Sequence, residues 1–274
     1  MPPPSKTASF LFNAALVYVA AVGFYVRAPA KASAPSGRDV HVGASFTYEI
    51  AASRAVSNAD GRTVARTSIG GKLSLVVVAA SSDGFTVRAE LSDPTRSEMP
   101  ARDGREALDA LSAPFAIAFG TDGEVLRVRF AERTPDEVRR ELHAVVASLQ
   151  IVAPDRAFDA RWERLESDEA GRYVAVYDRT SGRLEKTKLR YELVRAPGGL
   201  VPPQALGKSI AIRSATDIAL DASGWPATVH EEGTVVTTHD GLAPITMKAT
   251  TEARLVSRGV GRFEAASAML EHGG

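Results

Sequence analysis

One stretch decides the fold: residues 134–154, which read TPDEVRRELHAVVASLQIVAP. It begins with a hydroxyl residue, a proline and two carboxylates, a combination typical of a helix start, because Thr134 can cap the first turn and acidic groups favour the positive end of the helix dipole. Apolar residues then recur at helical spacing until Pro154 ends the run. The stretch predicts an amphipathic helix near residues 135–152, with a core face made of Val138, Leu142, Val145, Val146 and Leu149.

Segments with alternating or β-branched residues lie on both sides of this helix. Asp83-Gly84 and Thr121-Asp122-Gly123 mark two hairpins before it, and a shorter helix is expected at residues 105–111. After the helix, the strand pattern resumes at residues 160–167, 173–178, 184–194, 209–220, 227–237 and 245–256. The sequence therefore predicts a mainly β fold, in which antiparallel strands form a barrel or strongly curved sheet around one central amphipathic helix.

The N-terminal region predicts export. Residues 8–26 are apolar over a length that can cross a bilayer, Lys6 precedes them, and small residues at 28–34 resemble a signal-peptidase site. We expect residues 1–27 to form a hydrophobic helix that is either a cleaved signal peptide or a retained anchor, so the protein is periplasmic, secreted or membrane-anchored. Residues 28–43, rich in Ala, Pro and Ser, predict a flexible linker, 44–262 one β domain, and 263–274 a tail.

Composition excludes several classes of function. The 274 residues carry 33 Lys plus Arg and 33 Asp plus Glu, so no net charge attracts nucleic acid. Cysteine is absent, which excludes disulfides, thiolate nucleophiles and cysteine-ligated metals. No nucleophile elbow, phosphate loop or dinucleotide fingerprint occurs. We therefore expect no enzyme activity, no catalytic residues, no cofactor and no nucleic-acid partner.

Histidines and carboxylates are the remaining candidates for chemistry. No two histidines have the spacing of metal ligands on one helix or tight turn; His230 and His239 could meet across a hairpin at Gly233, but two ligands make a poor site, so we expect no metal. Four carboxylates cluster, and they predict either a solvated turn, which the nearby arginines favour, or a hydrolytic pair or calcium ligands: Glu163, Glu166, Asp168 and Glu169.

The two tryptophans have different expected roles. Trp162 is predicted to pack into the core near the helix. Trp225 follows Ser223-Gly224 and precedes Pro226, which predicts a hairpin tip or strand start. An exposed aromatic there could contact a ligand, a partner or a membrane, so Trp225 is the one candidate contact residue.

Three stretches resemble a known family. They are Gly123-Glu124-Val125 with its strand, the helix from Val138 to Gln150, and an acidic-glycine strand at 166–173 followed by Tyr177 and the lysine-threonine-lysine strand at 184–188. Together they resemble the N-terminal barrel of the large lipid transfer proteins, which include vitellogenins, microsomal triglyceride transfer protein and apolipoprotein B. The chain departs from the family where cysteines are common, since Tyr173 stands there.

This resemblance implies that the helix fills the barrel, so that the barrel is a packed scaffold. The family's lipid-lining sheets follow the barrel, whereas this sequence ends at Gly274, and we therefore expect no large lipid cavity. The leading hypothesis is an exported, membrane-proximal, lipid-transfer-like domain that contacts lipid or a lipid-handling protein, and the membrane itself if residues 1–27 are retained. An envelope scaffold that binds protein only is the alternative, and a hydrolase is a remote one.

Overall fold

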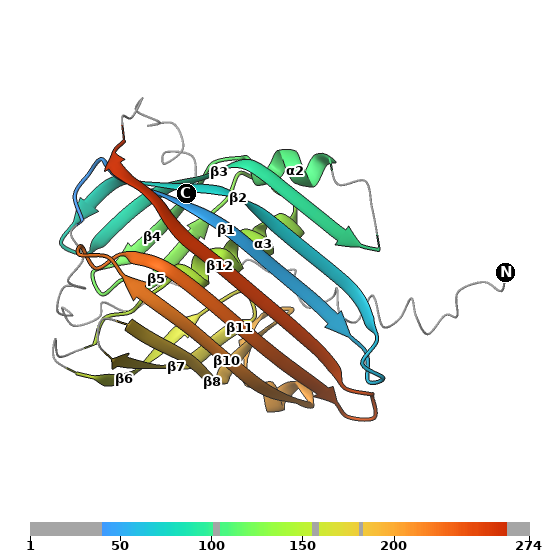
Figure 1. The fold of residues 1–274 in the computed structure, drawn as a ribbon. Coiled ribbons are helices and arrows are strands. Elements are labelled where there is room, and N and C mark those ends of the chain that lie inside the picture. Colours follow the sequence, from blue (N-terminus) through green and yellow to red (C-terminus); the bar gives the residue numbers. More distant parts are fainter. Residues whose placement is uncertain (1–39, 101–104, 155–158, 181–182, 262–274) are drawn as a thin grey trace.

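The computed structural model describes residues 40–100, 105–154, 159–180 and 183–261 (Figure 1). The predicted N-terminal helix, most of the predicted linker and the predicted tail lie outside these residues. The strands are β1 Ala44–Ser57, β2 Thr63–Ser81, β3 Gly84–Met99, β4 Phe115–Gly120, β5 Val125–Arg129, β6 Arg161–Ser167, β7 Gly171–Thr180, β8 Arg183–Ala196, β9 Gly199–Val201, β10 Lys208–Leu220, β11 Pro226–His239 and β12 Ile245–Val260. The helices are α2 Arg105–Leu111, α3 Asp136–Leu149 and the 3-10 turn η2 Pro203–Leu206.

All strands belong to one antiparallel sheet with the order β5-β4-β3-β2-β1-β12-β11-β10-β8-β7-β6, to which β9 adds by pairing with β8. The sheet curls into a nearly closed barrel, and α3 lies inside the curve (Figure 1). The prediction of a mainly β, antiparallel barrel or strongly curved sheet is confirmed, as is the short helix at residues 105–111. In the described part of the chain, no helix is both long and apolar enough to span a bilayer.

The segment after α3 fills the gap between the two edge strands, which do not pair with each other. On the β5 side, the backbone N–H of Val125 donates a 3.0 Å hydrogen bond to Oε1 of Gln150. On the β6 side, Nε1 of Trp162 donates a 2.9 Å bond to the carbonyl of Val152. The chain leaving the helix thus bridges the two edge strands through hydrogen bonds that involve side chains, and Trp162 is buried beside it as predicted.

The central helix is buried along the predicted face. Its five predicted core residues are between 0% and 8% exposed: Val138, Leu142, Val145, Val146 and Leu149. It ends at Leu149 rather than residue 152, because Gln150 adopts an extended conformation and begins the bridging segment. The predicted hydroxyl cap is absent, since Pro135 occupies the N-cap position and no side chain caps the helix.

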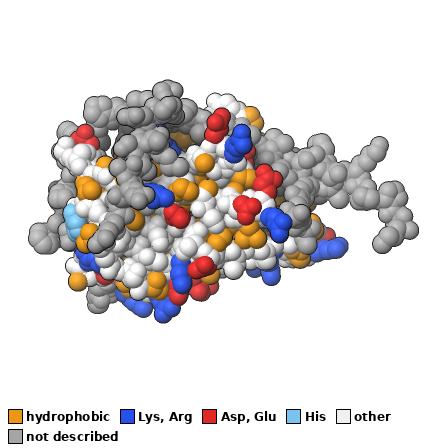
Figure 2. Space-filling model, turned by 90° about the horizontal axis from the view of Figure 1, so that it is seen from above, with side chains coloured by type: hydrophobic (Ala, Val, Ile, Leu, Met, Phe, Trp, Pro, Cys, Tyr) orange, Lys and Arg blue, Asp and Glu red, His pale blue; other side chains and the backbone are white. Residues whose placement is uncertain are grey.

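Charges of both signs share the outer surface. Figure 2 shows basic and acidic side chains interspersed on the face seen from above, with hydrophobic side chains between them. This mixing agrees with the equal numbers of acidic and basic residues in the sequence.

Candidate functional site

Trp225 is 3% exposed, so the expectation of an exposed aromatic is wrong. Its ring stacks on Phe46 with the centroids 4.1 Å apart. The preceding turn causes this placement, because Oδ1 of Asp221 accepts bonds from the backbone N–H groups of Ser223 and Trp225 and directs the indole inward. Whether Trp225 contacts a ligand therefore depends on the interior around it.

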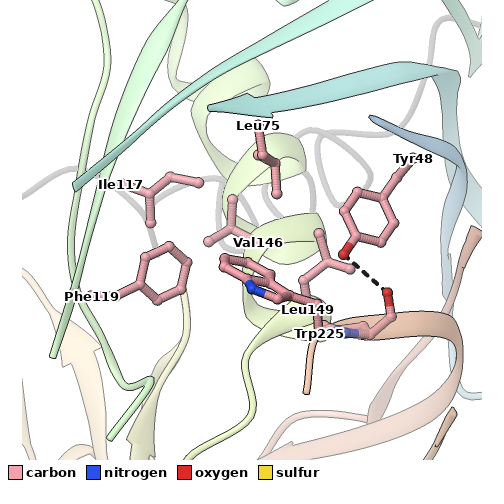
Figure 3. A pocket seen from close by; sticks show the side chains of 8 residues that line it. Tyr48, Leu75, Ile117, Phe119, Val146, Leu149 and Trp225 are labelled. Carbon is pink, nitrogen blue, oxygen red and sulfur yellow. Dashed lines mark hydrogen bonds between the residues drawn. The ribbon is translucent and has the colours of Figure 1, made fainter. Parts of the chain in front are cut away.

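The interior around Trp225 is nearly filled. Figure 3 shows the indole beside Phe119, Val146 and Leu149, with the hydroxyl of Tyr48 donating a 3.0 Å bond to the carbonyl of Pro226. The cavity left between these side chains is about 10 Å³, close to the smallest space that holds one water molecule. This cavity is far too small for a lipid, and α3 supplies part of its wall.

A buried ion pair fixes the end of α3 to the sheet. Lys186 of β8 and Glu166 of β6 both have fully buried side chains, and Nζ of Lys186 lies 3.2 Å from Oε2 of Glu166. The same ammonium donates to the carbonyls of Ala147, at 3.3 Å, and Gln150, at 3.0 Å. The carbonyl of Ala147 also accepts a 3.3 Å bond from the backbone N–H of Gln150. Because the carbonyls at the end of a helix lack the usual partner within the helix, Lys186 adds a buried donor to this end of α3.

Tyrosines complete the shell around Glu166. The hydroxyl of Tyr173 donates a 2.8 Å bond to Oε2, and the hydroxyl of Tyr177 donates to Oε1. Burial and the charge of Glu166 raise the pKa of Tyr173 well above its usual range, so it remains a donor. All these groups pair with one another, and the cluster holds the end of α3 against the sheet. We call the cluster of Lys186, Glu166, Tyr173 and Tyr177 the lock.

A second buried pair lies next to the first. Nζ of Lys188 is 3.2 Å from Oδ2 of Asp168 and 3.3 Å from Oε1 of Glu231, and the hydroxyl of Tyr191 donates a 2.8 Å bond to Asp168. Burial opposes the charge of Asp168, but Lys188 and Tyr191 outweigh it and lower the pKa of the carboxyl. Burial likewise opposes the charge of Lys188, yet Glu231 and Asp168 raise its pKa well above the usual value.

The carboxylate cluster is therefore not a solvated turn. Glu166 and Asp168 are 0% and 3% exposed, which corrects the expectation of a solvated turn. Glu163 is exposed on the opposite face of β6, because neighbouring side chains of a strand alternate between faces. Glu163 thus does not join Glu166 and Asp168, which lie in the two neighbouring buried clusters.

The histidines do not converge either. His230 and His239 lie in one continuous strand, β11, so the predicted hairpin at Gly233 is wrong. On the exposed face, Nε2 of His230 lies 3.4 Å from Oε1 of Glu232, and Nδ1 of His230 lies 3.6 Å from Oε1 of Glu252. Among the described residues, no three His, Cys, Asp or Glu side chains are placed to hold a metal ion.

The inner face of the sheet changes character along β11. Val229 pairs with Ala253 of β12 and Ile218 of β10, and all three are buried in the core. Val235 lies six residues further on and therefore points to the same face. Val235 is only partly buried. The inner face of β11 is therefore packed into the core at Val229 and partly open at Val235.

A row of apolar side chains crosses the sheet at this second position. Val56 of β1 pairs with Met247 of β12, Met247 with Val235 of β11, and Val235 with Ile212 of β10. We call these four the inner apolar row. Each is partly exposed, and none is among the described apolar side chains that pack against the main core. The inner apolar row is the candidate functional site.

Small and polar residues separate this row from the core. The adjacent inward positions on the core side of the row are Arg54, Ala249, Gly233 and Ser214, which pair with one another in that order. Two of the four have little or no side chain, so they leave space above the sheet. The sequence analysis missed the inner apolar row and the small and polar positions beside it, because it treated each alternating segment alone. Only the register between strands that are distant in sequence shows that these residues lie side by side.

Comparison with solved structures identifies the architecture. The fold is similar to that of lipovitellin. A structure describing lipid–protein interactions in lipovitellin matches with a TM-score of 0.58 and 10% sequence identity, over 82% of this chain and 26% of the lipovitellin chain. The chain thus spans about a quarter of lipovitellin. At this identity the likeness concerns the fold alone, and at that level it agrees with the predicted resemblance.

Other comparisons add no argument. An S-type phycobiliprotein lyase from Guillardia theta matches with a TM-score of 0.30 and 9% identity, over 77% of this chain and 88% of the lyase. That score is too low to compare sites. No protein-family model matches the chain, and no curated protein sequence matches it.

Proposed function

We propose that this protein is a lipid-contacting domain that holds an acyl chain along the inner apolar row. The observation that carries this function is the row itself: four aliphatic or thioether side chains lie side by side on the concave face of the sheet, partly exposed and outside the main core. Covering such a surface with a hydrocarbon chain is favourable by about 25 cal/mol per Å² of apolar area removed from water.

Two further features support lipid as the occupant. Met247 is unbranched and adapts its shape to a flexible chain. The barrel is similar in fold to lipovitellin, whose structure describes lipid–protein interactions. A lipid on the inner apolar row is held by the sheet and not by the barrel centre, where α3 leaves a cavity of only about 10 Å³ near Trp225.

We also propose a binding role without catalysis, at a location outside the cytoplasm. The contacts of Glu166 and Asp168 support a role without catalysis, because lysine and tyrosine side chains already pair with both carboxylates. The apolar segment at residues 8–26 supports the location outside the cytoplasm. Cell fractionation of the tagged full chain tests the location, and recovery in the cytoplasm contradicts it.

The test of lipid contact is retention of lipid by the purified full chain, measured by solvent extraction and mass spectrometry. The informative variant is Val235→Asn, which places an amide in the inner apolar row. The matched control is Val236→Asn, since Val236 is the next residue of β11, also partly exposed, but on the outer face. We expect Val235→Asn to lose most bound lipid and Val236→Asn to keep it.

Equal lipid retention by both variants contradicts a site on the inner row. Absence of lipid from the wild-type chain, with no binding to vesicles, contradicts lipid contact altogether. In that case crosslinking in cells tests the protein-binding scaffold, which retains its protein partners after detergent removes lipid.

A further inference from the structure

Three exposed cations lie in one row across the outer face of the sheet. Direct cross-strand pairs place six residues side by side from β3 to β10, in the order Met99, Arg66, Ala55, Lys248, Thr234 and Arg213. Arg66, Lys248 and Arg213 are exposed, and none of them forms an ion pair with another described residue. We call these three cations the basic row.

The neighbouring row has a different composition. One step closer to the core, the paired outer residues are Ser97, Ser68, Ser53, Thr250, Glu232 and Ala215. They include no cation, and their single carboxylate lies close to a histidine, with Oε1 of Glu232 3.4 Å from Nε2 of His230. The three cations of the basic row thus stand together on the sheet without a carboxylate at any position paired with them.

Exposed apolar side chains lie beside the basic row, toward the ends of the strands. Met99 is 44% exposed and pairs directly with Arg66, and Val64, 46% exposed, precedes Arg66 by two residues. Leu242, 49% exposed, lies in the turn between β11 and β12. Figure 1 shows this turn and the turn between β1 and β2 at the same end of the sheet. That end therefore presents cations and apolar side chains together.

The basic row and the inner apolar row lie on opposite faces of the same strand segments. Met247 and Lys248 are consecutive residues of β12, and Ile212 and Arg213 are consecutive residues of β10. Because neighbouring side chains of a strand point to opposite faces, each of these two cations lies directly behind a residue of the inner apolar row. A surface that binds the basic row is thus brought to the end of the sheet that carries the inner apolar row.

We propose that the basic row, together with Met99, Val64 and Leu242, docks this end of the sheet on the surface of a membrane that contains anionic lipids. The inference rests on the proposed lipid contact and adds the source of the lipid, which is the bilayer under this end of the sheet. Charge complementarity selects the occupant, because anionic headgroups supply the negative charge that the row lacks, while the bilayer accepts the exposed apolar side chains. The β domain makes this contact itself, without residues 8–26.

The test measures binding of the full chain to vesicles by sedimentation. Vesicles made of equal parts of phosphatidylcholine and phosphatidylserine are compared with vesicles of phosphatidylcholine alone. We expect the wild-type chain to prefer the anionic vesicles, and this preference should weaken as the salt concentration rises. Each cation near an anionic surface strengthens binding about fivefold, so the triple variant Arg66→Gln, Lys248→Gln, Arg213→Gln should bind anionic vesicles on the order of a hundredfold more weakly and neutral vesicles equally well.

The matched control replaces three exposed arginines outside the basic row, in the triple variant Arg129→Gln, Arg133→Gln, Arg161→Gln. The control changes the net charge by the same amount, and we expect it to keep the preference for anionic vesicles. Substitutions of exposed residues change stability little, so both triple variants should fold. An equal loss of binding in the two triple variants overturns docking through the basic row. Tighter binding of the wild-type chain to single-stranded RNA than to anionic vesicles overturns the membrane as the occupant.

A second measurement locates the contact even where residues 8–26 hold the chain on every vesicle. The chain has no cysteine, so Leu242→Cys carries an environment-sensitive dye at this end of the sheet alone. We expect the emission of that dye to shift to the blue with anionic vesicles. Val42→Cys is the control, because Val42 is 57% exposed and lies just before β1, at the opposite end of that strand, and its dye should not shift.

The outcomes separate docking from the proposed function. Absence of a shift at Leu242→Cys overturns the docking. Lipid retention by the purified wild-type chain without any preference for anionic vesicles overturns the docking too, but it leaves the lipid contact standing. A chain that docks through the basic row and never retains lipid contradicts the holding of an acyl chain by the inner apolar row alone.

Discussion

Strands β1, β12, β11 and β10 run through two different environments. In the part of these strands that lines the core, which we call the first half, inward residues such as Ile50, Val229 and Ile218 are buried with α3 and the aromatic side chains around Trp225. In the second half, inward residues of the same strands form the inner apolar row and stay partly exposed. The alternation of residues is the same in both halves, so alternation determines which face a side chain takes, while the helix determines what covers it.

The boundary between the halves is charged. Lys186, Lys188 and Glu231 lie on the inner face there, and Arg54 pairs across the interior with Glu169 of the turn between β6 and β7. Buried charges are costly unless paired, so this layer favours one arrangement of the helix and sheet over others. We infer that it holds the packed half together and keeps the second half distinct.

The largest expected effect comes from breaking the lock at this boundary. Lys186→Met removes the buried counter-ion of Glu166, and it removes the donor to the carbonyls of Ala147 and Gln150. We expect the free energy of unfolding to fall by about 3–5 kcal/mol, measured by urea denaturation.

Lys72→Met is the control for this change, because Lys72 is half exposed and lies 3.9 Å from Asp93, a surface pair worth less than about 1 kcal/mol. The double variant Lys186→Met with Glu166→Gln removes the unpaired charge, and it should recover part of the loss. A cost below about 1 kcal/mol for Lys186→Met contradicts the lock.

A smaller effect is expected at the second pair, with a definite pH dependence. The pKa of Asp168 is lowered in the folded chain, so its stabilisation is present above the unfolded carboxyl pKa of about 3.9 and is lost as pH falls through the folded value. The pKa of Lys188 is raised, so its stabilisation is present below the unfolded value of about 10.4 and is lost as pH rises through the folded one. The pair thus contributes fully between these limits.

Asp168→Asn tests this window. We expect a loss of about 2 kcal/mol at neutral pH, because a hydrogen-bonded charge is replaced by a neutral group. In acid the difference from the wild-type chain shrinks as wild-type Asp168 becomes protonated. Burial raises the pKa of Glu141, which titrates with the opposite sign in both chains and cancels from the difference. A difference that stays constant down to low pH contradicts the lowered pKa of Asp168.

The core face of α3 was predictable from the sequence, whereas the burial of Trp225, the buried ion pair and the inner apolar row were not. The helical spacing from Val138 to Leu149 placed the core face without any knowledge of the sheet. The exposure of Trp225 was predicted wrongly because its local turn indicates only the start of a strand. The contact with Phe46, which is distant in sequence, shows that this strand start is buried. Glu166 was expected in a solvated turn because charged residues are usually solvated, and its pairing with Lys186 depends on the order of β6, β7 and β8.

The smallest expected effect is that of Val235→Ala, and Val229→Ala gives the direct comparison, because both positions lie on one face of β11. Val229→Ala removes buried methyl groups beside Ala253 and Ile218, and we expect a loss of about 2–3 kcal/mol in the free energy of unfolding from transfer and cavity terms. Val235→Ala makes the same chemical change in the inner apolar row, where the side chain is partly exposed and outside the main core, and we expect less than about 1 kcal/mol. Lipid retention should show the opposite order, with the larger loss at Val235. Equal unfolding costs at the two positions would mean that the second half is packed as tightly as the first, and the inner apolar row could then not be a binding surface.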